Sequence, residues 1–146
     1  MPWLAAELPP DIPVPCITRA AEHFSLPAVA LVAILRQEGG KVGKAYPRSH
    51  GTYYGPFQIS DKWLPTLTKW GITEALLRDD ACTNVIAGAY VLAYYKVREA
   101  RWEDALARYN VGSLNTDERR EAGYRYARKV LGHWAEIYSK WHNAAR

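Results

Sequence analysis

The clearest helical signal in the sequence is a run from Ala28 to Leu35 that carries no polar side chain. Ser25 is a suitable N-cap for a helix at this place, Pro27 fits its first turn, and Gly39 and Gly40 end it. The pattern predicts a helix from Pro27 to Glu38 that is buried nearly all round, because no polar stripe is left to face water.

Helical periodicity recurs along most of the remaining chain. It predicts a short helix over residues 17–24, helical turns over 62–70 and 73–78, a long helix over 81–100 capped by Asp80, and helices over 102–109 and 118–141. The expected apolar side of the long helix consists of Val85, Ile86, Ala89, Leu92, Ala93 and Val97, and the stripe of the last helix consists of Tyr126, Val130, Trp134 and Ile137.

Three segments lack this periodicity. Residues 1–15 contain five prolines and are expected to run extended over the surface, so that a single domain covers residues 16–146. Residues 41–54 are rich in turn formers and predict a long loop or a small β-like flap. Residues 55–60 are too short and too closely flanked by Gly and Pro for a helix. The predicted fold class is mainly α.

Composition narrows the function only partly. The net charge of +4 is spread along the chain, which supports nucleic-acid binding weakly and suits a polyanionic wall polymer equally well. Ten Tyr and six Trp against two Phe fit either a surface that stacks on sugars or a helical core with a wet rim. No stretch reaches the length of a membrane span, and the N-terminus lacks the charged and apolar regions of an export signal.

Two cysteines, Cys16 and Cys82, leave two possibilities open. In a reducing cytosol they are buried thiols, and in an oxidising compartment they form one bridge. The four histidines fall on no metal-ligand spacing with Cys or carboxylates, so no metal site and no cofactor are expected.

Glu38 is the main candidate for a catalytic side chain, because it ends the same predicted helix three positions after Leu35, the last residue of the apolar run. A carboxyl group there either turns outward, paired with Arg36 or Lys41, or lies in a pocket of low polarity. Desolvation in such a pocket raises the pKa of a glutamate toward the range that suits a general acid at neutral pH.

Three motifs give Glu38 its context: residues 36–40 (Arg-Gln-Glu-Gly-Gly), 54–60 (Tyr-Gly-Pro-Phe-Gln-Ile-Ser) and 107–112 (Ala-Arg-Tyr-Asn-Val-Gly). In this order and spacing they resemble the motifs of lytic transglycosylases of the soluble-lytic-transglycosylase family, which have a lysozyme-like fold. The resemblance covers nearly all of the chain from Cys16 to about Val130. Cys16, residues 79–84 and residues 88–92 are similar to the small single-domain members that accompany secretion systems and pili.

The resemblance implies a role for each matching residue. Glu38 corresponds to the acid/base, and Gln58 to a side chain that faces the sugar, although hydrogen bonding at a strand end is an alternative for Gln58. The remaining implied substrate contacts are backbone groups around Gly55, Phe57 and Ile59, then Tyr109 and Asn110 across from Glu38, Tyr126 on the last helix, and more faintly Ser49. Core packing is the alternative for Tyr109.

The same resemblance implies the reaction. Most glycosidases use two carboxylates, but no motif here contains a second one, and Asp61 is the nearest. In the family the substrate's own N-acetyl oxygen replaces the nucleophile, and the C6 hydroxyl then closes a 1,6-anhydroMurNAc end. Two positions depart from the family pattern: Gly39 stands where serine is usual, and Tyr53-Tyr54 stand where aspartate is frequent.

The sequence therefore predicts a monomeric, periplasmic or secreted peptidoglycan lytic transglycosylase that opens the wall for a secretion system or pilus, with Cys16 and Cys82 bridged. That location implies a mature chain or another export route. The alternatives are a muramidase that uses water, a peptidoglycan-binding component that has lost turnover, and a basic nucleic-acid module. The basic residues of the last helix, Arg119, Arg120, Arg125, Arg128 and Lys129, form a solvated face or contact peptide carboxylates.

Overall fold

A computed structural model describes the backbone of residues 2–144 and the side chains of residues 2–142. Its helices are α1 (Pro2–Glu7), α2 (Val14–His23), α3 (Ala28–Glu38), α4 (Leu64–Leu67), α5 (Glu74–Asp79), α6 (Ala81–Lys96), α7 (Trp102–Val111) and α8 (Asp117–Ala144), with 3-10 turns η1 (Asp61–Trp63) and η2 (Thr68–Trp70). One small antiparallel sheet completes the fold, so the predicted mainly α class is confirmed.

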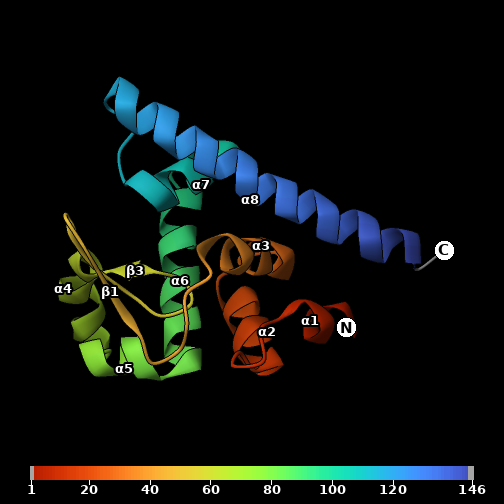
Figure 1. The fold of residues 1–146 in the computed structure, drawn as a ribbon, viewed down its shortest axis with the longest axis horizontal. Coiled ribbons are helices and arrows are strands. Elements are labelled where there is room, and N and C mark those ends of the chain that lie inside the picture. Colours follow the sequence, from red (N-terminus) through yellow and green to blue (C-terminus); the bar gives the residue numbers. More distant parts are fainter. Residues whose placement is uncertain (1, 145–146) are drawn as a thin grey trace.

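Helix α3 lies at the centre of the core, with every side chain from Ala30 to Leu35 buried. The long helix α8 packs along both α3 and α7, and α6 contacts α2, α5 and α7. Figure 1 shows α8 lying across one side of the molecule, with the sheet, α4 and α5 on the other side of α7 and α6. The apolar run therefore does what its pattern predicts: it fills the middle of the domain.

The sheet forms the expected flap. Strands β1 (Ala45–Arg48) and β2 (Gly51–Tyr54) make a hairpin, and the two-residue strand β3 (Ile59–Ser60) pairs antiparallel with β2. In the register, Tyr53 lies opposite both Tyr46 and Ser60. The hairpin positions the loop between β2 and β3, which contains the second motif.

Ser25 does not cap α3 as predicted. Its backbone is left-handed (φ 54°), and its N–H and that of Leu26 donate to the carbonyls of Glu22 and Ala21 at the end of α2. This is the hydrogen-bond pattern that closes a helix C-terminus. Helix α3 begins without a side-chain cap after Pro27, whereas the predicted cap of α6 is confirmed, because the Asp80 carboxylate accepts from the Thr83 N–H.

The expectation of an extended segment over residues 1–15 is wrong at both ends, since Pro2–Glu7 forms α1 and α2 already begins at Val14. Proline is tolerated in a first helical turn, where its missing N–H has no partner to lose, and no further proline follows before Pro9. Burial of Leu4 adds an apolar anchor. A smaller correction concerns α6, which ends at Lys96 and leaves Val97 79% exposed.

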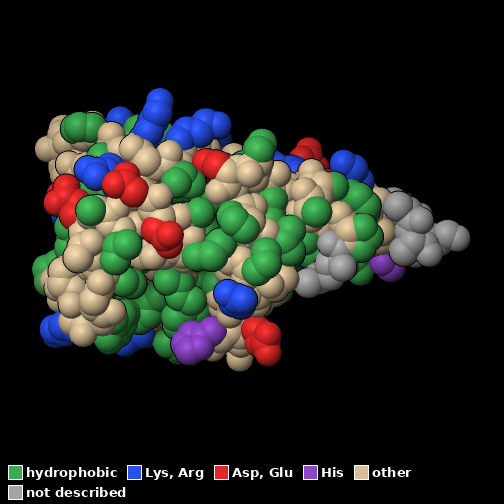
Figure 2. Space-filling view, turned by 90° about the horizontal axis from the view of Figure 1, so that it is seen from below, with side chains coloured by type: hydrophobic (Ala, Val, Ile, Leu, Met, Phe, Trp, Pro, Cys, Tyr) green, Lys and Arg blue, Asp and Glu red, His purple; other side chains and the backbone are tan. Residues whose placement is uncertain are grey.

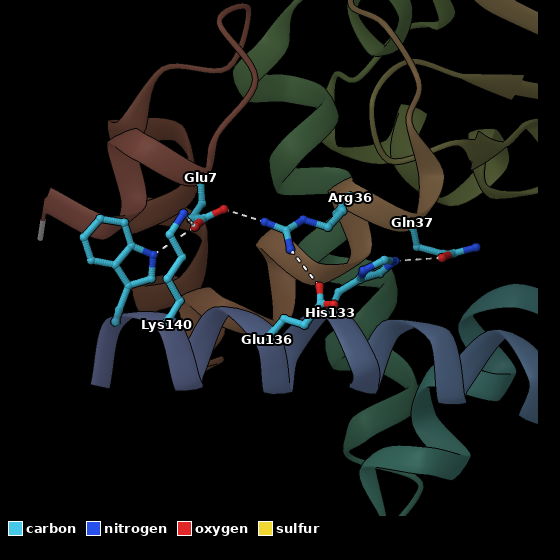
Figure 3. A network of polar contacts seen from close by, with 7 residues as sticks. Glu7, Arg36, Gln37, His133, Glu136 and Lys140 are labelled. Carbon is cyan, nitrogen blue, oxygen red and sulfur yellow. Dashed lines mark hydrogen bonds and ion pairs between the residues drawn. The ribbon is translucent and has the colours of Figure 1, made fainter. Parts of the chain in front are cut away.

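Glu7 joins α1 to the rest of the fold. Its carboxylate pairs with Arg36 of α3 and accepts from Lys140 Nζ at 3.2 Å and Trp141 Nε1 at 2.9 Å on α8. Figure 3 shows these side chains converging on Glu7, with Arg36 also facing Glu136. The pKa of Glu7 lies below its usual value. The hydrogen bond from Trp141 is the main cause, and the positively charged Lys140 and Arg36 add to it against the opposing effect of burial.

A disulfide between Cys16 and Cys82 ties α2 to the first turn of α6, with the two Cα atoms 4.8 Å apart. This confirms the bridge that the family resemblance implied. The bridge spans 66 positions of the chain, and closing a loop of that size in the unfolded state stabilises the fold by about 4 kcal/mol.

None of the helices in residues 2–144 is both long and apolar enough to cross a bilayer.

The basic side chains do not form one continuous patch on the face shown in Figure 2. They lie along its edges and leave its middle without a basic field.

Candidate active site

Glu38 is the last residue of α3, and its carboxyl group is poorly hydrated. Gly39 adopts the left-handed conformation (φ 65°) that ends the helix. The Glu38 Oε2 atom is buried and has no hydrogen-bond partner among the described residues. Buried polar atoms without partners are rare, and one in a cleft marks a position that a ligand or a reaction completes.

Burial raises the pKa of Glu38 from its ordinary value of 4.5 to about 8. The alternative of a solvated carboxylate paired with a neighbouring cation does not hold in this structure. Arg36 is bound to Glu7 and Glu136, and within residues 2–142 no ion pair joins Glu38 to Arg36 or Lys41. The carboxyl group therefore carries its proton at pH 7 and can donate it.

Three tyrosines lie within electrostatic reach of Glu38. Its charge raises the pKa values of Tyr53, Tyr109 and Tyr126, for each of which burial is the larger cause. The rings of Tyr109 and Tyr126 are stacked, with centroids 6.3 Å apart. The Tyr126 hydroxyl is buried and, like Glu38 Oε2, lacks a partner in the described part of the chain. The first and third motifs thus meet at Glu38.

The second motif reaches the same place through a close backbone approach. A Cβ atom on Gly40 would lie 2.0 Å from the Gly55 carbonyl oxygen and 2.6 Å from Gln58 Nε2, so only glycine fits there. Gln58 itself has a left-handed backbone (φ 53°), and its Nε2 donates to the Gly55 carbonyl at 2.9 Å. Non-glycine residues held in this conformation are enriched at functional sites.

Asn84 of α6 anchors the loop between β2 and β3 that contains the second motif. Its side chain is completely buried, accepts from the Phe57 N–H at 2.9 Å, and donates to the carbonyls of Tyr54 and Leu77, each at 2.9 Å. All three groups are backbone atoms, so the asparagine acts as a clamp between the sheet, α5 and α6. The sequence placed Asn84 only within a stretch of family resemblance, because periodicity does not show which polar side chains are buried.

Tyr109 fixes the loop from the other side. Its hydroxyl donates to the Phe57 carbonyl at 2.8 Å, which links α7 to the second motif. The hydroxyl hydrogen is therefore used by the backbone, and a lone pair on the oxygen remains available to an incoming donor.

A cleft of about 440 Å³ opens beside these groups. Among the predicted residues, Gln58, Ile59, Tyr109 and Asn110 line it. Glu38 is not itself a lining residue, but its charge acts on Tyr53 and Tyr109 of the cleft wall, and Gly40, two residues after it, lies against Gln58 of the same wall. Arg119, which the sequence offered only as part of a solvated or carboxylate-binding face, also lines it. The other lining residues were not among the predicted site residues: Tyr53, Ser60, Lys62, Trp63, Thr66, Val91, Tyr95, Val111, Gly112 and Ser113.

Four further predicted residues, besides Glu38, lie outside the lining. Gly55 and Phe57 are buried in the loop beneath it, and the backbone N–H and C=O groups of both are hydrogen-bonded within the protein. Tyr126 is 7% exposed and lies behind Tyr109. Ser49 lies in the turn between β1 and β2, exposed, 3.4 Å from His50 Nδ1. The Tyr and Trp excess was the only sequence signal for the missed Tyr53, Trp63 and Tyr95.

Among the described residues no second carboxylate acts on Glu38, because burial is the only cause of its raised pKa. No Asp or Glu is among the residues that line the cleft within the described chain. Asp61 accepts a hydrogen bond from the Thr52 N–H at 3.1 Å and is held against the hairpin. Nor do residues 2–142 contain a group of three metal-ligating side chains.

Comparison with known proteins places this site in a family. The model of the transglycosylase SLT domain matches residues 15–131. The invasion protein IagB of Salmonella typhimurium is 32% identical over 127 residues, which cover 84% of this chain and 76% of that protein. The X polypeptide of Escherichia coli K12 is 29% identical over 127 residues (85% and 75%), and the protein IpgF of Shigella flexneri is 25% identical over 124 residues (84% and 80%).

Proposed function

The chain belongs to the transglycosylase SLT domain family, and from this premise we propose that it is a peptidoglycan lytic transglycosylase with Glu38 as its only acid/base. The observation that carries the proposal is a protonated carboxyl group with a buried, unpartnered oxygen, beside a cleft that no Asp or Glu of the described chain lines. Such a site can donate a proton but lacks the partner that a two-carboxylate glycosidase needs.

In the first step, the Glu38 carboxyl group protonates the oxygen that links MurNAc to GlcNAc, and the bond from MurNAc C1 to that oxygen breaks. The carbonyl oxygen of the MurNAc N-acetyl group bonds to C1 and replaces the missing nucleophile. Glu38 is left as a carboxylate in a poorly hydrated site. Its pKa of about 8 makes it a much stronger base than an exposed glutamate.

In the second step, the C6 hydroxyl oxygen of the same sugar attacks C1, and the bond from C1 to the acyl oxygen breaks. The hydroxyl proton passes to the Glu38 carboxylate, which restores the acid. The products are a free GlcNAc hydroxyl and a 1,6-anhydroMurNAc end. One raised pKa therefore serves both steps.

The residues around Glu38 position the substrate. Gln58, held by the Gly55 carbonyl, keeps its side-chain oxygen as an acceptor for a sugar group. Tyr109 offers a lone pair beside the stacked Tyr126 ring, and Asn110 is exposed on the cleft wall. We assign these three side chains to substrate binding, and the backbone at Gly55, Phe57 and Ile59 to shaping the cleft. Ser49 lies in the exposed turn of the hairpin, outside the cleft lining.

Product analysis tests the proposal. We expect mass spectrometry of peptidoglycan treated with this protein to find 1,6-anhydroMurNAc ends, which are lighter by one water than reducing ends. Reducing ends alone would identify a muramidase, in which water replaces the C6 hydroxyl. Binding to insoluble peptidoglycan without any soluble product would identify a peptidoglycan-binding component that has lost turnover. Gly39 has no side chain to hold the Glu38 carboxylate, and this favours such a loss.

We further propose that the protein acts in the periplasm or outside the cell, where its substrate lies, and opens the wall locally for a secretion system or pilus. The disulfide supports an oxidising location. The name of its Salmonella typhimurium relative, an invasion protein, agrees with such a role.

A further inference from the structure

Two cations line the cleft, and they come from different parts of the fold. Lys62 belongs to η1, directly after the sheet, and Arg119 belongs to the first turn of α8. The chain segments that carry them are separated by more than fifty positions. Arg119 is also the only residue of the basic stretch on α8 that lines the cleft.

Neither cation is neutralised by the protein. Both residues are exposed, and within the described residues no ion pair or side-chain hydrogen bond involves Lys62 Nζ or the Arg119 guanidinium. Other arginines are paired, including Arg120 with Asp117 and Arg125 with Glu121. Their charges are satisfied locally, whereas those of Lys62 and Arg119 are available to a ligand.

The cleft wall offers these cations no acidic partner either. Asp61, the neighbour of Lys62, is engaged with the Thr52 N–H of the hairpin. Among the described residues that line the cleft there are therefore two cations and no carboxylate, although the nearby charge of Asp61 acts on Tyr53 of the wall, and Glu38 itself is neutral at pH 7. A neutral sugar polymer gains nothing from this charge, but a ligand with carboxylates does.

We infer that Lys62 and Arg119 form a subsite that binds the carboxylates attached to the muramic acid sugar. The inference rests on the proposed function and adds a selection rule to it: the cleft prefers strands that carry acidic substituents over neutral N-acetylglucosamine polymers. Arginine suits a two-point contact with a carboxylate, and lysine adds a compact charge. Two sources offer this chemistry, namely the peptide stem and, on a strand stripped of peptides, the lactyl group itself.

Binding measurements with three ligands separate these sources. The ligands are a peptide-bearing glycan fragment, the same fragment with its peptides removed by an amidase, and neutral chitohexaose. Glu38→Gln serves as the background to prevent cleavage, and titration is followed by calorimetry or by the fluorescence of Trp63 in the cleft. Arg119→Ala and Lys62→Ala are each expected to weaken binding of the acidic ligands about tenfold, a loss typical of one charged hydrogen bond.

Chitohexaose provides the internal control. Its affinity is expected to stay within twofold in both variants, which also shows that the cleft is folded. Arg128→Ala removes an equal charge from the exposed surface of α8, outside the cleft lining, and is expected to change none of the three affinities. Weakening confined to the peptide-bearing ligand assigns the subsite to the stem carboxylates. Weakening confined to the stripped ligand assigns it to the lactyl carboxylate, which is free only there, and weakening of both acidic ligands means that the subsite accepts either carboxylate.

Two results overturn the inference: a loss of chitohexaose binding equal to that of the acidic ligands, or a loss no larger than in Arg128→Ala. The proposed function is judged separately by the products of the native chain. Anhydro ends formed without any preference for acidic strands would refute the subsite alone.

Discussion

Glu38→Gln is expected to lower the release of anhydromuropeptides from purified peptidoglycan by at least about a thousandfold, within the range that removal of a general acid or base produces. The amide keeps the size of the side chain but can neither donate the proton at the first step nor accept one at the second. With no other carboxylate lining the cleft in the described chain, no neighbour replaces it. Chromatography with mass detection of the soluble products measures the effect.

Glu22→Gln is a matched control, because Glu22 is an exposed glutamate on α2 that lies outside the cleft lining. Its rate is expected to stay within twofold of the native rate. Release by Glu38→Gln at the native rate, with the same anhydro ends, would remove Glu38 from the reaction.

The stability of Glu38→Gln is expected to depend on pH differently from the stability of the native chain. The pKa of Glu38 is about 8 in the folded state against an ordinary 4.5, so the folded state binds this proton more tightly than the unfolded chain. The stabilising contribution of the protonated group is complete below pH 4.5 and is lost as the pH rises toward 8. At pH 7 the loss is about 3 kcal/mol.

Glutamine does not titrate, so Glu38→Gln lacks this loss. Urea unfolding at pH 4 and pH 7 measures the free energy of unfolding of both proteins. The variant is expected to gain about 3 kcal/mol relative to the native chain between the two pH values. A constant difference between the proteins would mean that Glu38 titrates near its ordinary pKa and is hydrated.

Local patterns predicted those parts of the fold and site that depend on neighbours in sequence. The apolar run predicted α3 and the unusual position of Glu38 at its end. An acidic side chain just before a segment with helical periodicity predicted that Asp80 caps α6. The flap followed from turn residues. The pairing of Cys16 with Cys82 came from the family resemblance, since two cysteines alone leave the redox state open.

What the sequence missed depends on contacts between distant segments. Ser25 has the side chain of a typical N-cap and was predicted to begin α3, but its backbone closes the C-terminus of α2 instead. Helix α1 was missed because prolines flank a short stretch whose stability comes from Leu4 burial and from Glu7 contacts with α3 and α8. Lys62 and Arg119 are far apart in the sequence and line one cleft only in the folded chain.

The departure at Gly39 has a local explanation in the backbone. Gly39 occupies a left-handed helix end, and a Cβ atom there would meet nothing within 4 Å. A serine would have space but would strain the backbone by about 1–2 kcal/mol. Gly39 therefore leaves the helix end unstrained but provides no hydroxyl to hold the carboxylate. This agrees with the lack of a partner for Glu38 Oε2 among the described residues.

Asn84→Ala is expected to destabilise the protein by about 3–5 kcal/mol, because it leaves three buried backbone groups without partners at about 1–3 kcal/mol each before water enters. These groups are the Phe57 N–H and the carbonyls of Tyr54 and Leu77. The loop that carries Gln58 loses its anchor on α6, and a shift of about 1 Å there lowers turnover by about a hundredfold. Urea unfolding and the product assay measure the two effects.

Asn115→Ala is the control, since Asn115 is exposed and its side chain makes no hydrogen bond with the described residues; its stability is expected to stay within about 0.5 kcal/mol of native. Asn84→Asp tests the clamp even if the alanine variant fails to fold. Aspartate still accepts from the Phe57 N–H, but when ionised it turns an oxygen toward two carbonyl oxygens. It is therefore expected to be less stable at pH 7 than at pH 4, relative to native, because only the protonated acid can donate to one of them. If both Asn84 variants unfold like Asn115→Ala at either pH, the clamp does not hold the loop.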